Sequence, residues 1–158
     1  MNGLFSKVAR TAVVVVSTVL SATAAHSGAS DACAVLSAAD VSAALGKKAN
    51  AGQPITPTDH KVCTWKAADG QSWVTLFLQP SSAFDGGLRL AGYSNGKLKP
   101  VQVSGLGDGA YFLPVGDQVG LMVKKGGVAF KVAVYQHGPL APKEAAERTL
   151  AGKVAGRL

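Results

Sequence analysis

The chain has 158 residues, with 16 lysines and arginines against nine aspartates and glutamates, and a formal net charge of +7 at pH 7. This length suits one domain and is too short for two well-built cores. Charged residues make up only 16% of the sequence and hydrophobic residues 47%, which excludes a disordered polar chain. Two cysteines also exclude a four-cysteine zinc site and a dense disulfide scaffold.

The first 25 residues have the pattern of a secretory signal peptide. Basic Lys7 and Arg10 precede an apolar run over residues 11–20, and small residues follow. A small-x-small pattern predicts cleavage after Ala24, with Ala25 as a close alternative. We therefore expect residues 1–25 to be removed, which lowers the formal net charge from +7 to +5 because Lys7 and Arg10 are lost.

The same segment argues against a membrane anchor. A transmembrane helix needs about 20 apolar residues, and this run is shorter and breaks into Ser, Thr and His. A lipoprotein signal needs a cysteine directly after the apolar run, whereas the first cysteine here is Cys33. We expect a processed protein with no stable membrane anchor, located in the periplasm or secreted.

Export determines how the two cysteines are interpreted. In an oxidising compartment an even pair is most simply a disulfide, so we expect Cys33 and Cys63 to be bonded. Closing a loop of about 31 residues would stabilise the fold by roughly 3.5–4 kcal/mol on the chain-entropy model. Redox chemistry is the alternative, but it favours a Cys-x-x-Cys pair, which this spacing does not provide.

Residues 26–32 are expected to form a flexible lead-in to a single domain over residues 33–158. Ser37 and Asp40 form a capping box, and Gly46 supplies a C-terminal stop, so the sequence predicts a helix over residues 38–45. Two prolines indicate a loop over residues 47–61.

Two strands are expected next, over residues 62–66 and 72–79, joined by a turn at Asp69-Gly70. The second strand is apolar on both faces, which predicts a central strand covered on both sides. A weaker helix, interrupted by Gly86-Gly87, is expected over residues 81–91.

Four further strands and a closing helix follow. The strands are expected over residues 100–103, 110–113, 118–124 and 128–136. The helix, starting near Pro142, carries an apolar stripe at every fourth residue: Ala146, Leu150, Val154 and Leu158. The fold class is therefore α+β: a single antiparallel sheet of about five to six strands, packed by a short N-terminal helix and a C-terminal helix, with one disulfide.

No motif in the sequence predicts catalysis, a metal site or a cofactor. The glycines of Gly105-Leu-Gly-Asp-Gly109 precede a strand, not a helix, which favours a turn, with Asp108 as its cap, over a phosphate-binding loop or a calcium site. The three histidines lack a hydrolase or zinc motif. The basic residues are spread out and the aromatic residues lie at core-like positions, so we expect no nucleic-acid binding.

Three segments together carry a resemblance: Cys33 to Gly46, Cys63-Thr-Trp65, and Gly105 to Tyr111. This set, spanning about residues 33–135, resembles a family of small exported bacterial domains of unknown function, many of them actinobacterial lipoproteins. The resemblance implies a Cys33–Cys63 pair and a small α+β domain at the cell envelope. The family has no established catalytic residues to transfer, and this chain lacks the lipoprotein cysteine.

These observations predict an exported, non-enzymatic envelope domain that binds a partner protein or a small ligand, whose identity the sequence leaves open. One alternative is a secreted or periplasmic inhibitor of a hydrolase, with an exposed loop such as residues 47–61 plugging its cleft. Another is an envelope enzyme, which would require a cleft holding two acids or a Ser/His pair.

Overall fold

The structure is a computed structural model and describes residues 31–158. The expected signal peptide and its cleavage site lie outside the described residues. The helices are α1 (Ala32–Val35), α2 (Ala38–Leu45), α3 (Ser82–Tyr93) and α4 (Leu140–Arg157). The strands are β1 (Gln53–Thr56), β2 (Asp59–Lys66), β3 (Trp73–Pro80), β4 (Val101–Val103), β5 (Gly109–Phe112), β6 (Leu121–Lys125) and β7 (Val128–Tyr135).

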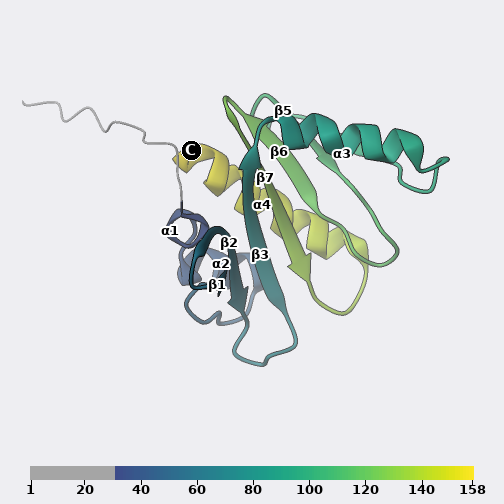
Figure 1. Cartoon of the computed structure of the whole chain (residues 1–158). Helices are drawn as coiled ribbons and strands as arrows, with labels where there is room; N and C mark the ends of the chain where they lie inside the picture. The colour runs from purple at the N-terminus through teal and green to yellow at the C-terminus, as the bar shows by residue number, and fades with distance from the viewer. Residues whose placement is uncertain (1–30) are drawn as a thin grey trace, which may run out of the picture.

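The strands form one antiparallel sheet in the order β1-β2-β3-β7-β6-β5-β4 (Figure 1). The long strands β3 and β7 are in its centre, paired from Trp73↔Tyr135 to Pro80↔Val128. The α+β class with helices packed on one antiparallel sheet is confirmed.

The sheet has seven strands, one more than the upper expectation. The additional strand is β1, which lies within residues 47–61, so the prediction of a loop there is wrong in part. Pro54 is compatible with a strand here because β1 is at the sheet edge, where one side of the backbone has no neighbouring strand to bond.

One face of the sheet, the covered face, carries the main hydrophobic core. Helix α4 packs on β6 and β7, α1 packs on β2 and β3, and α2 packs on α4 (Figure 1). The buried side chains that the strands contribute to this face are Cys63, Trp65, Val74, Leu76, Leu78, Val103, Ala110, Phe112, Leu121, Val123, Phe130, Val132 and Val134.

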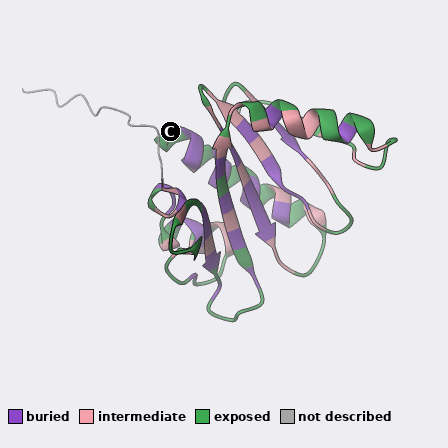
Figure 2. Cartoon of the chain, viewed as in Figure 1, coloured by how far each residue is buried: buried purple, intermediate pink, exposed green. Residues whose placement is uncertain are grey.

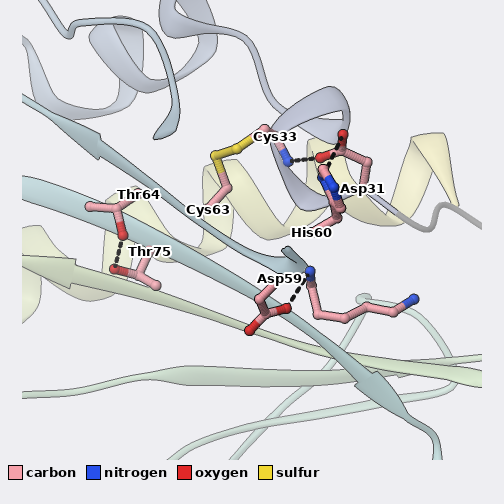
Figure 3. Close-up of a disulfide and its surroundings, with 8 residues drawn as sticks. Asp31, Cys33, Asp59, His60, Cys63, Thr64 and Thr75 are labelled. Atoms are coloured by element: carbon pink, nitrogen blue, oxygen red, sulfur yellow. Dashed lines mark hydrogen bonds and ion pairs between the residues drawn. A yellow bond between two sulfur atoms is a disulfide. The ribbon is translucent and has the colours of Figure 1, made fainter. Parts of the chain in front are cut away.

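The disulfide ties α1 to the covered face. Cys33 and Cys63 are bonded, with 5.1 Å between their Cα atoms (Figure 3). Asp31 accepts a hydrogen bond from the Cys33 N–H at 2.8 Å and caps α1, and Ala32 is fully buried. Asp31 and Ala32 therefore belong to α1 and not to the flexible lead-in to which the sequence assigned them.

Helix α2 forms as predicted. The Ser37 hydroxyl accepts from the Asp40 N–H at 3.1 Å, Asp40 accepts from the Ser37 N–H at 3.0 Å, and Gly46 ends the helix with a left-handed φ of 64°. The Asp40 carboxylate also binds Arg157 at 2.7 Å and Lys153 at 3.1 Å, both from α4. The Arg157 guanidinium holds the pKa of Asp40 well below its usual range, aided by the Ser37 N–H.

Helix α4 buries a wider stripe than predicted. Leu150 and Val154 are buried as expected, but Lys143 and Glu147 are buried beside them. Glu147 accepts a hydrogen bond from the Val134 N–H at 2.8 Å, and Lys143 donates to the Asp117 carbonyl at 2.6 Å. Glu147 is therefore a buried member of the core and not part of the exposed surface of the helix.

The position of β6 explains why Glu147 is buried. Pairing of β6 with β7 stops at Leu121↔Val132, so Val134 lies beyond that ladder and Glu147 supplies its N–H with an acceptor. The second carboxyl oxygen of Glu147 has no hydrogen-bond partner among residues 31–158. Burial raises the pKa of Glu147 to about 8 despite the hydrogen bond from Val134, which favours the charged form.

Within the described part of the chain, the opposite face of the sheet is covered only at one end, by α3. Phe84 of α3 packs edge-on against Tyr111, whose hydroxyl donates to the Phe84 carbonyl at 3.0 Å. A Cβ atom at Gly87 would overlap the Tyr111 hydroxyl, so this glycine allows the helix backbone to lie close to β5. Helix α3 runs on past the sheet (Figure 1) and leaves Leu90 and Tyr93 exposed.

Candidate functional site

The part of the opposite face that α3 does not cover is the candidate site. We call it the open face. It comprises the outward-facing residues of β1, β2, β3 and β7: Gln53, Ile55, Val62, Thr64, Lys66, Trp73, Thr75, Phe77, Lys131, Ala133 and Tyr135. The prediction that β3 is covered on both sides is therefore wrong for most of its length. Figure 2 shows buried residues alternating with more exposed ones along this strand.

Cross-strand register arranges β2, β3 and β7 on the open face in three rows. The first row is Lys66, Trp73 and Tyr135; the second is Thr64, Thr75 and Ala133; the third is Val62, Phe77 and Lys131. All the long side chains lie in the outer rows, where only Val62 is short, and the middle row carries short side chains alone. The face is therefore a trough that runs across the strands, with small residues on its floor.

The walls and floor of the trough are fixed by local contacts. In the first row, the Trp73 and Tyr135 rings stack, with centroids 5.0 Å apart and planes 14° from parallel. On the floor, the hydroxyl oxygens of Thr64 and Thr75 lie 3.3 Å apart and form a hydrogen bond (Figure 3). The Trp73 and Tyr135 rings and the Thr64 and Thr75 hydroxyls thus each have a packed neighbour, which gives this part of the trough a defined shape.

Two hollows open along this trough. The larger, of about 540 Å³, is lined by Asn50, Ala51, Gln53, Pro54, Ile55, Thr64 and Lys66. The smaller, of about 250 Å³, is lined by Ile55, Val62, Thr75, Phe77, Lys131, Ala133 and Tyr135. Because Ile55 lines both, the two hollows are adjacent. Their combined size falls in the range of small-molecule sites, about 300–1,000 Å³.

The only charged side chains that line these two hollows are the cations Lys66 and Lys131. Within residues 31–158 neither lysine forms an ion pair. The Lys131 stem lies against Gly120, where a Cβ atom would collide with its Cε atom, so this side chain is held over the start of β6. The open face thus has two unpaired positive charges around an apolar and aromatic surface.

A third hollow, outside the open face, is lined by both a serine and a histidine. Ser72 and His137, from the adjacent ends of β3 and β7, line a hollow of about 240 Å³ with Lys47. Ser72 is buried, and its hydroxyl lies 3.4 Å from the Lys47 ammonium. Among residues 31–158 no hydrogen bond joins Ser72 to His137, so the nucleophile–base contact that hydrolysis needs is not formed here.

The other sequence-predicted residues have structural roles. The glycine-rich segment forms a turn before β5 as expected, but Asp108 does not cap this turn: it accepts from the Gly126 N–H at 2.6 Å and so ties the turn to the one between β6 and β7. The His60 ring lies 3.6 Å from the Asp31 carboxylate, beside the disulfide (Figure 3). Among the described residues there is no group of three or more His, Cys, Asp or Glu side chains that could hold a metal ion. No helix of the described part is long and apolar enough to cross a membrane.

Sequence reasoning missed the open face because it placed the aromatic residues in the core. Trp73 and Phe77 are instead 38% and 39% exposed. A signal was present: Lys131 lies in the middle of β7 on the same face as Phe77, and a lysine at such a position marks a face that reaches solvent.

Comparison with known proteins adds no family assignment. The chain matches no protein-family model, and no curated protein matches it.

Proposed function

We propose that this protein is an exported, non-enzymatic envelope domain that binds a ligand or partner through the open face. One observation carries the proposal: a shape-defined apolar trough that no helix within residues 31–158 covers, with lysines on its walls that form no ion pair in that part of the chain. A contiguous exposed apolar surface is costly to leave in water and commonly marks an interaction site. The floor and walls include Thr, Ala, aliphatic, aromatic and Lys side chains, and within residues 31–158 no hydrogen bond joins a threonine hydroxyl there to a lysine amine.

Export is the second part of the proposal. The signal-peptide pattern of residues 1–25 and the Cys33–Cys63 bond support it, since stable disulfides persist mainly outside the reducing cytosol. Intact-mass measurement of the processed protein tests it. Loss of residues 1–24 or 1–25 is the expected result, and a full-length chain with two free thiols would contradict it.

Membership in the family of exported bacterial domains stays a prediction. The hydrolase-inhibitor alternative has no specific support, because residues 53–56 and 59–61 of the expected plugging loop are paired in β1 and β2. The enzyme alternative centres on Ser72 and His137, and a hydrolytic activity that the Ser72→Ala variant loses would overturn the non-enzymatic proposal.

The binding role is tested by recovering what the exported protein retains. The full chain is expressed with its leader, purified from the periplasm or medium, and analysed by native mass spectrometry. We expect a bound molecule that the Ile55→Ser variant loses. The matched control is Val115→Ser: Ile55 and Val115 are β-branched and similarly exposed, at 62% and 57%, but Val115 lies in the turn before β6.

Two outcomes would contradict the binding role. One is a wild-type protein that retains no molecule. The other is a molecule that both serine variants retain equally, because it would then be bound elsewhere.

A further inference from the structure

The charge distribution of the open face narrows its ligand class. We infer that the open face binds an organic anion with a flat apolar body, a step that rests on the proposed function. The stacked Trp73 and Tyr135 rings and the partly exposed Phe77 ring provide the apolar contact surface. Lys66 and Lys131 provide the complementary charge, and no carboxylate lines either hollow.

The arrangement of the lysines indicates where the anionic groups bind. Lys66 is in the first row on β2, and Lys131 is in the third row on β7. Lys131 is therefore two strands away from Lys66 and four residues along β7 from Tyr135, which shares the row of Lys66. Strand spacing and rise place their Cα atoms about 16 Å apart, at opposite corners of the grid. One anionic group therefore contacts one lysine, with the apolar body across the Thr75 floor. A ligand with a negative group at each end contacts both.

The same charges disfavour two other occupants. A second copy of the chain docked through the same face in a two-fold dimer would bring Lys66 and Lys131 of both copies into one apolar interface without a carboxylate to pair them. A cationic ligand would meet two like charges in the trough. An anionic group instead gains an ammonium donor in a partly desolvated setting.

Three naphthalene compounds test the inference, because their body is constant and only the charge changes. Binding of naphthalene-2-carboxylate, naphthalene-2,6-dicarboxylate and naphthalen-2-ylmethylammonium to the processed protein is measured by calorimetry at low salt. We expect the monocarboxylate to bind at least about fivefold more tightly than the ammonium compound, and the dicarboxylate more tightly again. Inorganic phosphate, which lacks an apolar body, is expected to compete weakly.

Single lysine variants locate the effect. Lys66→Gln and Lys131→Gln are each expected to weaken carboxylate binding about two- to fivefold and to leave binding of the ammonium compound unchanged or stronger. The control is Lys97→Gln, which removes an exposed lysine outside the open face and should change neither affinity. Raised ionic strength should reduce carboxylate binding by the wild type and by the control alike.

The outcomes separate this inference from the proposed function. Equal affinity for the carboxylate and the ammonium compound overturns the inference, while sensitivity of both to Ile55→Ser would still support the open face as a binding surface. Carboxylate binding that neither lysine variant weakens also overturns it. If no naphthalene compound binds, or if the chain forms a dimer that Ile55→Ser dissociates, the inference is wrong, and the retention experiment above still decides the binding role.

Discussion

The two faces of the sheet are built from the same strands but differ in what covers them. Leu76 and Phe77 are neighbours on β3, yet Leu76 is fully buried on the covered face and Phe77 is 39% exposed on the open face. Helix α4 runs along the covered face and buries two adjacent rows of residues, one of Ala146, Leu150 and Val154 and the other of Lys143, Glu147, Ala151 and Ala155. Helix α3 contacts only one end of the other face and then extends past the sheet (Figure 1).

This difference shows that an apolar strand residue has two possible roles in this fold. On the covered face it stabilises the core. On the open face it contributes to an exposed apolar surface to which, in our proposal, another molecule binds. The following predictions test this division, from the largest expected change in stability to the smallest.

Truncating neighbouring residues of β3 should have very different effects. Leu76→Ala removes a fully buried side chain from the centre of the core and should lower the free energy of unfolding by about 2–5 kcal/mol. Phe77→Ala should lower it by less than about 1.5 kcal/mol, because the ring is partly hydrated and its removal leaves no sealed cavity. Urea unfolding with the disulfide intact measures both. Similar losses in the two variants would show that the open face is part of the core.

The disulfide should stabilise the covered face by a comparable amount. The double variant Cys33→Ser/Cys63→Ser should lose about 3.5–4 kcal/mol, because the unfolded chain regains the entropy of a loop of about 31 residues. Reducing the disulfide of the wild type should lower the free energy of unfolding by a similar amount. This control separates the effect of losing the bond from the effect of introducing two serines. A folded protein whose stability does not respond to reduction would contradict this role.

Glu147 should make stability depend on pH. Its folded-state pKa, about 8, is above the unfolded value, so its contribution is fully present below about pH 4.5 and is lost as the pH rises through 8. Within this window the slope approaches about 1.4 kcal/mol per pH unit. In Glu147→Gln, which keeps an acceptor for the Val134 N–H, this fall should be absent. Chemical unfolding from pH 4 to 9 measures the difference, and parallel pH profiles for the two proteins would contradict the assignment.

Local signals in the sequence predicted much of the covered face. The capping box at Ser37 and Asp40, the helix stop at Gly46 and the apolar stripe of α4 depend on neighbours within a few residues, and each is confirmed, except that the last stripe residue, Leu158, lies beyond α4 and is only partly buried. The pairing of Cys33 with Cys63 was also predictable, because the chain has only two cysteines.

The open face was harder to predict, because exposure depends on which helix covers which strand. Alternation shows that Phe77 and Leu76 lie on opposite faces, but not which face α4 covers. Similarly, β1 forms around Pro54 because it pairs with β2 at the edge of the sheet, although its local sequence favours a loop. Glu147 is buried because β6 starts late, a feature of tertiary register that no local pattern of α4 contains.

The boundary of the open face should depend on the close approach of α3 to β5. Gly87→Ala places a methyl group against the Tyr111 hydroxyl and should destabilise the fold by about 1–3 kcal/mol, although alanine favours a helix. Adding Tyr111→Phe removes the hydroxyl, so the double variant should recover part of this loss, less the hydrogen bond to the Phe84 carbonyl. A double-mutant cycle by urea unfolding measures this coupling. Strictly additive losses would mean that the helix is held at the end of the sheet by other contacts, and that Gly87 does not set where the open face begins.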